Sequence, residues 1–162
     1  METSIDIQNI CTSQHWTVAT AESCTGGRIA SRLTAIAGSS AYFEGSIVAY
    51  QERVKERLLN VDAQMIEQYN VVSEPVAKSM VKGACRLFGS DFAVASTGCA
   101  GPGGGTDKIP VGTIWIAAGN KDMQIARCLH HDKGRIQNVE EAADQALLLL
   151  LQFIQEQIKT TE

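Results

Sequence analysis

The chain lacks a long apolar run, a basic excess and an abundance of aromatic residues. Its longest apolar run covers residues 146–151, far short of the ~20 residues that a membrane-spanning helix needs. Aromatic residues make up 6% of the sequence, and 14 Lys and Arg stand against 18 Asp and Glu, for a net charge of −4. Nucleic-acid-binding modules usually carry a basic excess. We therefore expect neither a membrane nor a nucleic acid among the partners of this protein.

Metal-ligand and disulfide patterns are also lacking, and so is a secretion signal. The cysteines are odd in number and contain no C-x-x-C pair: Cys11, Cys24, Cys85, Cys99 and Cys128. This pattern is typical of reduced thiols rather than of a disulfide framework or a structural zinc site. The adjacent His130 and His131 have no further ligand at suitable spacing, so we expect no metal. The first residues contain neither a basic region nor an apolar run, which predicts a cytoplasmic protein.

What the chain does have is 44% hydrophobic residues over 162 positions, enough to bury one sizeable core. No repeat, low-complexity segment or linker divides it, so we expect a single domain covering residues 1–162. Compact apolar segments predict strands at 16–21, 42–50, 92–97, 111–118 and 123–129. Helical periodicity predicts helices around 7–11, from 25 onward, near 54–59 and 62–69, at 74–88 and at 137–158. This alternation predicts an α/β sandwich with a mostly parallel sheet, to which the last two strands add an antiparallel hairpin.

The helix expected at 74–88 has the clearest limits. Ser73 supplies a capping hydroxyl, and Glu74 and Pro75 suit the first turn, because an acid favours the helix dipole and proline needs no amide partner there. Gly89 is expected to end it.

A first candidate site is the segment Ala-Glu-Ser-Cys-Thr-Gly-Gly at residues 21–27, which joins an expected strand to an expected helix. Ligands of open α/β sheets bind at this edge, where free amides favour anions. Ser23 is a candidate nucleophile, and Gly26 and Gly27 allow a substrate to approach the backbone. On residue types alone, however, Ser23 or Thr25 as a helix cap is the more common arrangement. Cys24 is a second candidate nucleophile, ranked below Ser23 because such thiols are more often packed.

A second candidate is the loop that follows the third expected strand, with the sequence Thr-Gly-Cys-Ala-Gly-Pro-Gly-Gly-Gly-Thr at residues 97–106. Successive glycine amides can form anion-binding concavities. The loop matches neither the dinucleotide-binding nor the P-loop pattern. A flexible connection is the alternative, although so many glycines raise the entropic cost of folding.

A third candidate is the pair Tyr50 and Lys55, placed between a strand end and a helix start. A lysine can act as a general base if burial lowers its pKa by several units, and a serine–lysine pair then needs no histidine. Taken alone, Lys55 is more often a solvated helix charge, and Tyr50 a sheet-edge aromatic residue.

Taken together, these segments resemble the C-terminal domain of the competence/damage-inducible CinA proteins, over roughly residues 5–158. The matching residues are Ala21–Gly27, Gly38–Ser40, Phe43, Val48–Tyr50, Lys55, Leu58–Leu59, Val72–Ser73, the Thr97 to Gly105 loop and Pro110–Thr113. The resemblance implies a three-layer α/β/α sandwich over a mixed sheet. It also implies that the chain is the stand-alone form, without the amino-terminal domain of the longer CinA proteins, and a homodimer is expected.

The resemblance further implies deamidation of nicotinamide mononucleotide to nicotinate mononucleotide and ammonia, with no metal and no cofactor. Ser23 matches the family nucleophile, Lys55 the lysine that activates it and Tyr50 the tyrosine beside them. Backbone amides near Thr25, Gly26 and Gly27, or in the glycine-rich loop between Gly98 and Gly105, would then stabilise the oxyanion. The expected substrate-binding residues are Thr25, Gly26, Gly27, Thr97, Gly98, Gly101, Gly103, Gly104 and Arg135.

The chain departs from the family pattern before its last helix, where family members commonly carry arginines expected near the substrate phosphate. Ile136 and Glu140 occupy two of these positions, and Arg135 or Lys133 could supply the charge instead. Ile109 stands where a lysine is usual. These departures leave two alternatives open: a non-catalytic nucleotide-binding member of the family, or an amidase for another nicotinamide-type substrate.

Overall fold

The computed structural model describes residues 1–161, and within this range the chain alternates between strands and helices. In chain order the elements are α1 (Glu2–Gln14), β1 (Val18–Glu22), α2 (Arg28–Thr34), the short 3-10 helix η1 (Ser39–Ala41), β2 (Phe43–Val48), α3 (Glu52–Leu59), α4 (Ala63–Tyr69), α5 (Glu74–Phe88), β3 (Phe92–Gly98), β4 (Ile114–Gly119), β5 (Gln124–Leu129) and α6 (Arg135–Thr161).

The five strands form one sheet in the order β2-β1-β3-β4-β5. Strand β1 pairs in parallel with β2 and β3, whereas β4 pairs antiparallel with both β3 and β5. Only β4 therefore runs against the other strands. The predicted mixed sheet, with a hairpin that adds an antiparallel strand, is confirmed.

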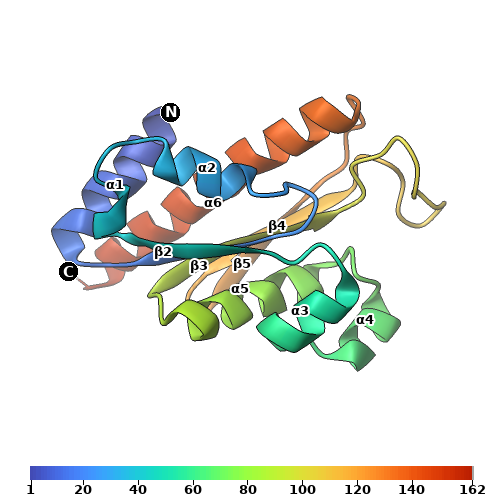
Figure 1. Ribbon diagram of the computed structural model, residues 1–162, viewed down its shortest axis with the longest axis horizontal. Helices are drawn as coiled ribbons and strands as arrows, with labels where there is room; N and C mark the ends of the chain where they lie inside the picture. Colours follow the sequence, from blue (N-terminus) through green and yellow to red (C-terminus); the bar gives the residue numbers. More distant parts are fainter. Residues whose placement is uncertain (162) are drawn as a thin grey trace.

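Helices cover both faces of the sheet, which makes the fold a three-layer sandwich (Figure 1). Helices α1, α2 and α6 share one apolar core with Val94 of β3, and α3, α4 and α5 share a second core with Ala93 and Ala95. The neighbouring residues of β3 serve different cores because successive strand side chains point to opposite faces. The predicted α/β/α layering is confirmed.

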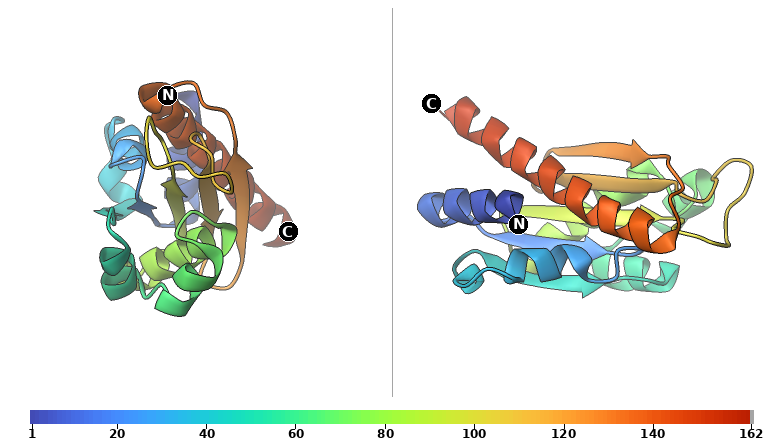
Figure 2. Two further views of the ribbon diagram at one scale, coloured as in Figure 1. Left: turned by 90° about the vertical axis from the view of Figure 1, so that its right-hand side faces the viewer. Right: turned by 90° about the horizontal axis from the view of Figure 1, so that it is seen from above.

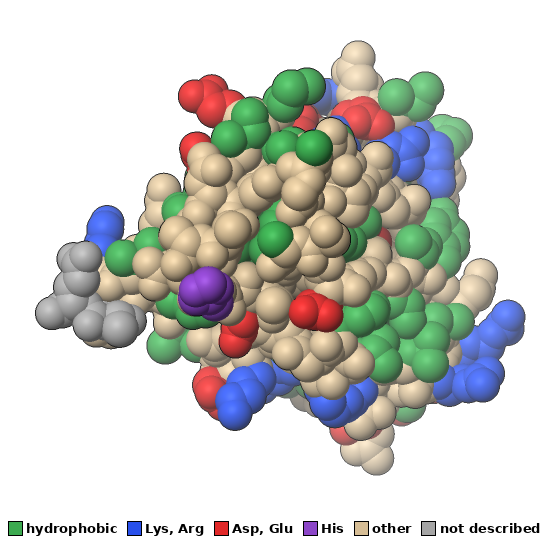
Figure 3. Space-filling model, turned by 60° about the vertical axis from the view of Figure 1, so that its left-hand side comes forward, with side chains coloured by type: hydrophobic (Ala, Val, Ile, Leu, Met, Phe, Trp, Pro, Cys, Tyr) green, Lys and Arg blue, Asp and Glu red, His purple; other side chains and the backbone are tan. Residues whose placement is uncertain are grey.

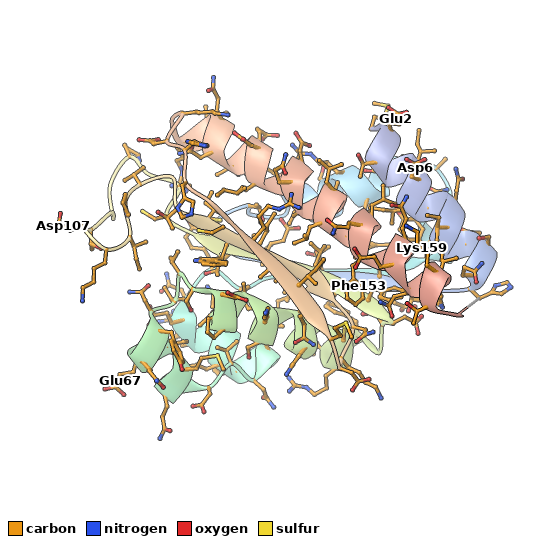
Figure 4. The ribbon with its side chains drawn as sticks, turned by 180° about the vertical axis from the view of Figure 1, so that it is seen from behind. Glu2, Asp6, Glu67, Asp107, Phe153 and Lys159 are labelled. Atoms are coloured by element: carbon orange, nitrogen blue, oxygen red, sulfur yellow. The ribbon has the colours of Figure 1, made fainter. Side chains whose placement is uncertain are left out.

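Helix α6 crosses the sheet obliquely beside α1 and α2 (Figure 2). Its Phe153 points toward the sheet (Figure 4) and is 1% exposed. The ring meets that of Phe92 edge-on, with centroids 6.0 Å apart. This packing extends the core toward the end of the sheet where the strand β3 begins.

Local capping decides three helix ends, two as predicted and one not. Ser73 accepts the Val76 amide at the start of α5, and Gly89 ends α5 at φ 65°, so both predicted limits are confirmed. Helix α2, in contrast, begins at Arg28. Its N-cap residue is Gly27, which has no side chain that could accept hydrogen bonds from the first amides of the helix. The prediction that Ser23 or Thr25 caps this helix is therefore wrong.

The carboxyl ends of β1, β2 and β3 lie at one end of the molecule, on the right in Figure 1, together with the glycine-rich loop and the start of α6. Asp107 marks the tip of this loop, well away from the sheet (Figure 4). On the face shown in Figure 3, basic and acidic side chains are interspersed and neither sign dominates an area. Among the described residues, none of the helices is both long and apolar enough to cross a bilayer.

Candidate active site

Ser23 lies at the carboxyl end of the central parallel strands, directly after β1. Its amide donates to the carbonyl of Ser96 on the neighbouring strand β3 at 3.0 Å, which extends the sheet pairing by one residue. Ser23 is 8% exposed. A cleft of about 370 Å³ opens above it. The cleft is lined by Ser23, Cys24, Tyr50, Gln51, Glu52, Arg53, Lys55, Val71, Val72, Thr97, Gly98, Ala100 and Arg135.

Lys55 reaches the floor of the same cleft from the first turns of α3. Its Nζ lies 2.9 Å from Ser23 Oγ and donates to the carbonyl of Ala49 at 2.7 Å and, more weakly, to that of Tyr50 at 3.4 Å. Only 1% of Lys55 is exposed. The interpretation of Lys55 as a solvated helix charge is wrong, and the structure brings together the two residues that the sequence placed in a serine–lysine pair.

Burial lowers the pKa of Lys55 from 10.5 to about 8, because an ammonium group loses hydration in the interior. At pH 7 such a group is neutral in roughly a tenth of the molecules, against fewer than about one in a thousand for an ordinary lysine. A neutral amine has two hydrogens and one lone pair. With the hydrogens directed at the Ala49 and Tyr50 carbonyls, the lone pair faces the Ser23 hydroxyl, and this arrangement can remove the serine proton.

Cys24 is the neighbouring thiol that competes with Ser23 for the role of nucleophile. It is 7% exposed, and burial raises the pKa of the thiol to about 12. Because the thiolate is the reactive form, Cys24 is an inert thiol at neutral pH. The geometry and the pKa values both favour Ser23.

Tyr50 and Arg135 meet at the mouth of the cleft. Arg135 donates to the Tyr50 hydroxyl at 3.0 Å and to the carbonyl of Gly101 at 2.7 Å. The Tyr50 side chain therefore points toward Arg135, and only its backbone carbonyl contacts Lys55. Arg135 links the segment after β2, the glycine-rich loop and the start of α6, and it brings a positive charge to the cleft.

Ile136 and Glu140, which are expected to stand where family members carry arginines, lie outside the lining of the cleft. Ile136 is 73% exposed, and Glu140 forms ion pairs with Arg28 and Arg32 of α2. Glu140 thus ties α6 to α2 rather than facing a ligand. Among the residues of this segment, Arg135 is the one that lines the cleft.

Thr97 and Gly98 line the cleft but also have structural partners. The Thr97 hydroxyl donates to the carbonyl of Val71 at 2.9 Å, which joins β3 to the segment before α5. A Cβ added at Gly98 would lie 2.6 Å from the Ile114 side chain, so the close pairing of β3 with β4 requires glycine here. Both residues shape the cleft wall.

The glycines further along the loop belong to an adjoining hollow of about 380 Å³ that shares Arg135 with the main cleft. Gly101, Gly103 and Gly104 line it. Gly101 and Gly104 have φ values of 81° and 86°, a conformation that favours glycine. These three glycines therefore lie beside the Ser23 cleft, and Arg135 lies between the cleft and the adjoining hollow.

Glu22 is the residue that sequence reasoning missed. It is fully buried, and its carboxylate accepts the amides of Gly27, Ile29 and Ala30 at 2.8–3.1 Å. Charged residues are almost never fully buried without partners. An acid within a strand of buried residues was therefore a signal in the sequence that it had a specific set of hydrogen-bond donors.

The contacts of Glu22 correct the expected oxyanion site. The Gly27 amide donates to Glu22 and the Gly26 amide donates to the Ser23 carbonyl at 3.1 Å, so both are engaged within the protein. The Thr25 hydroxyl is buried against Glu22 and Ser96. The contacts therefore do not support the prediction that the amides of Gly26 and Gly27 stabilise an oxyanion, or the prediction that Thr25 binds the substrate.

Residues 2–154 match the sequence profile of the CinA C-terminal domain. A CinA-like protein of Cytophaga hutchinsonii is 42% identical over 146 residues, which make up 90% of this chain and 34% of that protein. A CinA-like protein of Mycolicibacterium vanbaalenii is 60% identical over 97 residues, or 60% of this chain and 23% of that protein. The chain thus spans about a third or less of the length of these curated relatives.

Crystal structures of related proteins share the fold over nearly the whole chain. The competence damage-inducible protein A (ComA) of Klebsiella pneumoniae superposes with a TM-score of 0.89 at 31% identity, covering 93% of this chain and 94% of that one. The competence/damage inducible protein CihA of Agrobacterium tumefaciens gives a TM-score of 0.87 at 36% identity, covering 91% and 90%. Sequence profile, identity and fold agree, and the chain belongs to the CinA C-terminal domain family.

Proposed function

We propose that this protein hydrolyses the carboxamide of nicotinamide mononucleotide, giving nicotinate mononucleotide and ammonia, by a serine–lysine mechanism. The observation that carries the proposal is the buried Lys55 amine, of lowered pKa, at 2.9 Å from the Ser23 hydroxyl on the floor of a cleft. The substrate is the one implied by the resemblance of the residue 21–27 segment, Lys55 and the glycine-rich loop to the family.

In the first half-reaction, Ser23 Oγ attacks the amide carbon while the neutral Lys55 amine takes the serine proton. The negative charge then formed on the amide oxygen needs hydrogen-bond donors, each worth roughly 3 to 4 kcal/mol in comparable sites. The amides of Gly26 and Gly27 are engaged elsewhere. The Cys99 amide likewise donates to the Thr113 carbonyl, so the donors come from the remaining backbone of the cleft wall, at Cys24, Gly98 and Ala100.

The tetrahedral intermediate collapses when the C–N bond breaks. The Lys55 ammonium returns its proton to the departing nitrogen, ammonia leaves, and the acyl group stays on Ser23 Oγ. In the second half-reaction Lys55 takes a proton from water, the resulting hydroxide attacks the ester, and the proton then returns to Ser23 Oγ as the acid leaves. Atoms and charges balance, and no group outside the chain other than water is required.

The nucleotide part of the substrate lies toward the mouth of the cleft in this proposal. Arg135 is the charged group there that spans two loops, with hydrogen bonds to neutral oxygens of Tyr50 and Gly101. A phosphate is a stronger acceptor for a guanidinium than either of these neutral oxygens. Arg135 accordingly supplies the phosphate contact, and Tyr50 orients it.

The direct test measures ammonia release from nicotinamide mononucleotide by the wild type and by Ser23→Ala. We expect the variant to lose activity by at least about 10³-fold, because the Ser23 hydroxyl is the one that contacts Lys55 Nζ among the described residues. Ser31→Ala, an exposed serine on α2, is the matched control and should retain full activity. Cys24→Ala should also remain active. Equal rates for the wild type and Ser23→Ala would reject the mechanism.

A further inference from the structure

Glu22 lies directly before Ser23 and has no exposed surface. Its carboxylate accepts hydrogen bonds from a set of surrounding donors. These are the hydroxyls of Thr20 at 3.3 Å and Thr25 at 2.6 Å, and the amides of Gly27 at 2.9 Å, Ile29 at 3.1 Å and Ala30 at 2.8 Å. The three amides can act only as donors, so both carboxylate oxygens of Glu22 accept hydrogen bonds from the backbone of residues 27–30.

The three amides among these donors belong to the first turn of α2. Helices usually satisfy such amides with a side chain at the N-cap, which here is the side-chain-free Gly27. Glu22 replaces that cap from a distant position, and its negative charge is favoured at the positive end of the helix. Glu22 therefore fixes both ends of the turn formed by residues 23–27. Its peptide bond joins it to Ser23 at one end, and its carboxylate accepts the Gly27 amide at the other.

Glu22 is connected to the nucleophile through a second short path. The Thr25 hydroxyl donates to Glu22 and lies 2.7 Å from Ser96 Oγ, which in turn accepts the Ser23 amide at 3.4 Å. All four residues are buried. The position of the Ser23 backbone thus depends on side chains that Glu22 orders.

Glu22 is connected to the lysine as well. Its backbone carbonyl accepts the Ala49 amide at 2.8 Å, and the Ala49 carbonyl accepts Lys55 Nζ at 2.7 Å. Glu22 is therefore connected to both members of the reactive pair, to the lysine through its main chain and to the serine through its side chain.

We infer that Glu22 is a positioning residue that sets the direction of the Ser23 hydroxyl toward Lys55. The inference rests on the proposed serine–lysine mechanism but not on the identity of the substrate. Glu22 contacts neither the cleft nor a reacting atom, and acts through the turn that carries Ser23.

The test uses a fluorophosphonate probe, which reports on the nucleophile without any assumption about the natural substrate. Ser23 Oγ forms a bond to phosphorus, fluoride leaves, and the serine proton passes to Lys55. Labelling rates are compared for the wild type, Glu22→Gln, Glu22→Asp and Thr25→Val, with folding checked for each by circular dichroism. Asp91→Asn is the control, because the Asp91 carboxylate also accepts from a backbone amide and a hydroxyl, both of Thr17, at the opposite end of β3.

In Glu22→Gln the amide nitrogen meets the N–H donors of α2, which displaces the turn. We expect labelling of the folded variant to slow by about 10²-fold, as for an ångström-scale misplacement of a nucleophile. Glu22→Asp should recover part of this loss, and Thr25→Val, which keeps the three amide bonds, should slow roughly tenfold. With the mononucleotide as substrate, kcat should fall while KM stays within about twofold of wild type.

A merely structural role would lower the melting temperature and leave the labelling rate of the folded protein unchanged. Labelling of Glu22→Gln at the rate of Asp91→Asn would therefore overturn the inference. If Glu22→Gln does not fold, the labelling rate of Thr25→Val is the test. A wild-type labelling rate in that variant would overturn the inference about Glu22. Absence of Ser23 labelling in the wild type itself would instead reject the proposed mechanism.

Discussion

The amine of Lys55 and the hydroxyl of Ser23 lie 2.9 Å apart, although 32 positions separate them in the sequence. The serine directly follows a central strand, and the lysine comes from a helix on one face of the sheet. Two backbone carbonyls hold the amine in a site where little water reaches it. The lowered pKa and the fixed direction of the lone pair have the same cause, which is the burial of a lysine among acceptors that carry no full charge.

The pH dependence of the proposed reaction should follow Lys55. Because the neutral amine is the base, kcat/KM should rise about tenfold per pH unit below 8 and level off above it. Lys55→Arg should lose both the rise and at least about 10²-fold in rate, since arginine stays protonated. Initial rates of ammonia release between pH 6.5 and 9.5 check this. A flat profile in the wild type would remove Lys55 as the base.

The buried amine should also reduce stability. The unfolded lysine holds its proton up to about pH 10.5, whereas the folded one releases it near 8. The unfolded state thus binds more protons between these values, and stability rises with pH across this window. The penalty, about 3 kcal/mol from the shift of the pKa, is fully present below pH 8.

Lys55→Met removes this penalty together with the lysine hydrogen bonds. We expect its free energy of unfolding at pH 7 to exceed that of the wild type by roughly 1–3 kcal/mol, with the difference shrinking toward pH 10.5. Urea denaturation at a series of pH values measures it. Lys82→Met, at an exposed position of α5, is the control and should change little. A less stable Lys55→Met at every pH would contradict the assigned pKa.

Arg135 should govern the affinity for the phosphate rather than the chemistry. Arg135→Ala is expected to raise KM for nicotinamide mononucleotide by roughly 10- to 100-fold, the effect of one charged hydrogen bond. Turnover of nicotinamide riboside, which has no phosphate, should change little. Ile136→Ala alters the exposed neighbour and serves as the control. Equal losses with both substrates would place Arg135 in another role.

Alanine substitutions at two glycines, one at the end of β3 and one in the loop after it, should differ in their effect on the free energy of unfolding. In Gly98→Ala the new Cβ would lie 2.6 Å from the Ile114 side chain, whereas nothing lies within 4 Å of a Cβ at Gly103. We expect Gly98→Ala to lower the free energy of unfolding by about 1–3 kcal/mol and Gly103→Ala to change it by less than about 0.5 kcal/mol. Chemical denaturation of both variants checks this, and similar losses in the two would show that strand packing does not explain Gly98.

Much of the fold could be predicted because it depends on local chemistry. The limits of α5 follow from Ser73 and Gly89, whose caps involve only residues of the same turn. The alternation of buried strands with amphipathic helices predicts the layers, since each apolar face must be covered. Residue types alone also located Ser23 and the glycine-rich loop at strand ends, where an α/β sheet binds its ligands.

The chemical state of the candidate site was decided by the tertiary structure. Residue type alone predicts a solvated charge at Lys55. Only the packing of α3 against the sheet makes it a buried amine, with its pKa lowered to about 8. The position of Glu22 beside a buried strand indicates that it has hydrogen-bond donors, but only the folded chain shows that these are amides of a helix that begins at Arg28. The sequence by itself determined which elements form and which residues could react. Desolvation and hydrogen bonding between segments distant in the chain decided the charge and direction of those residues, because both depend on neighbours that only folding brings together.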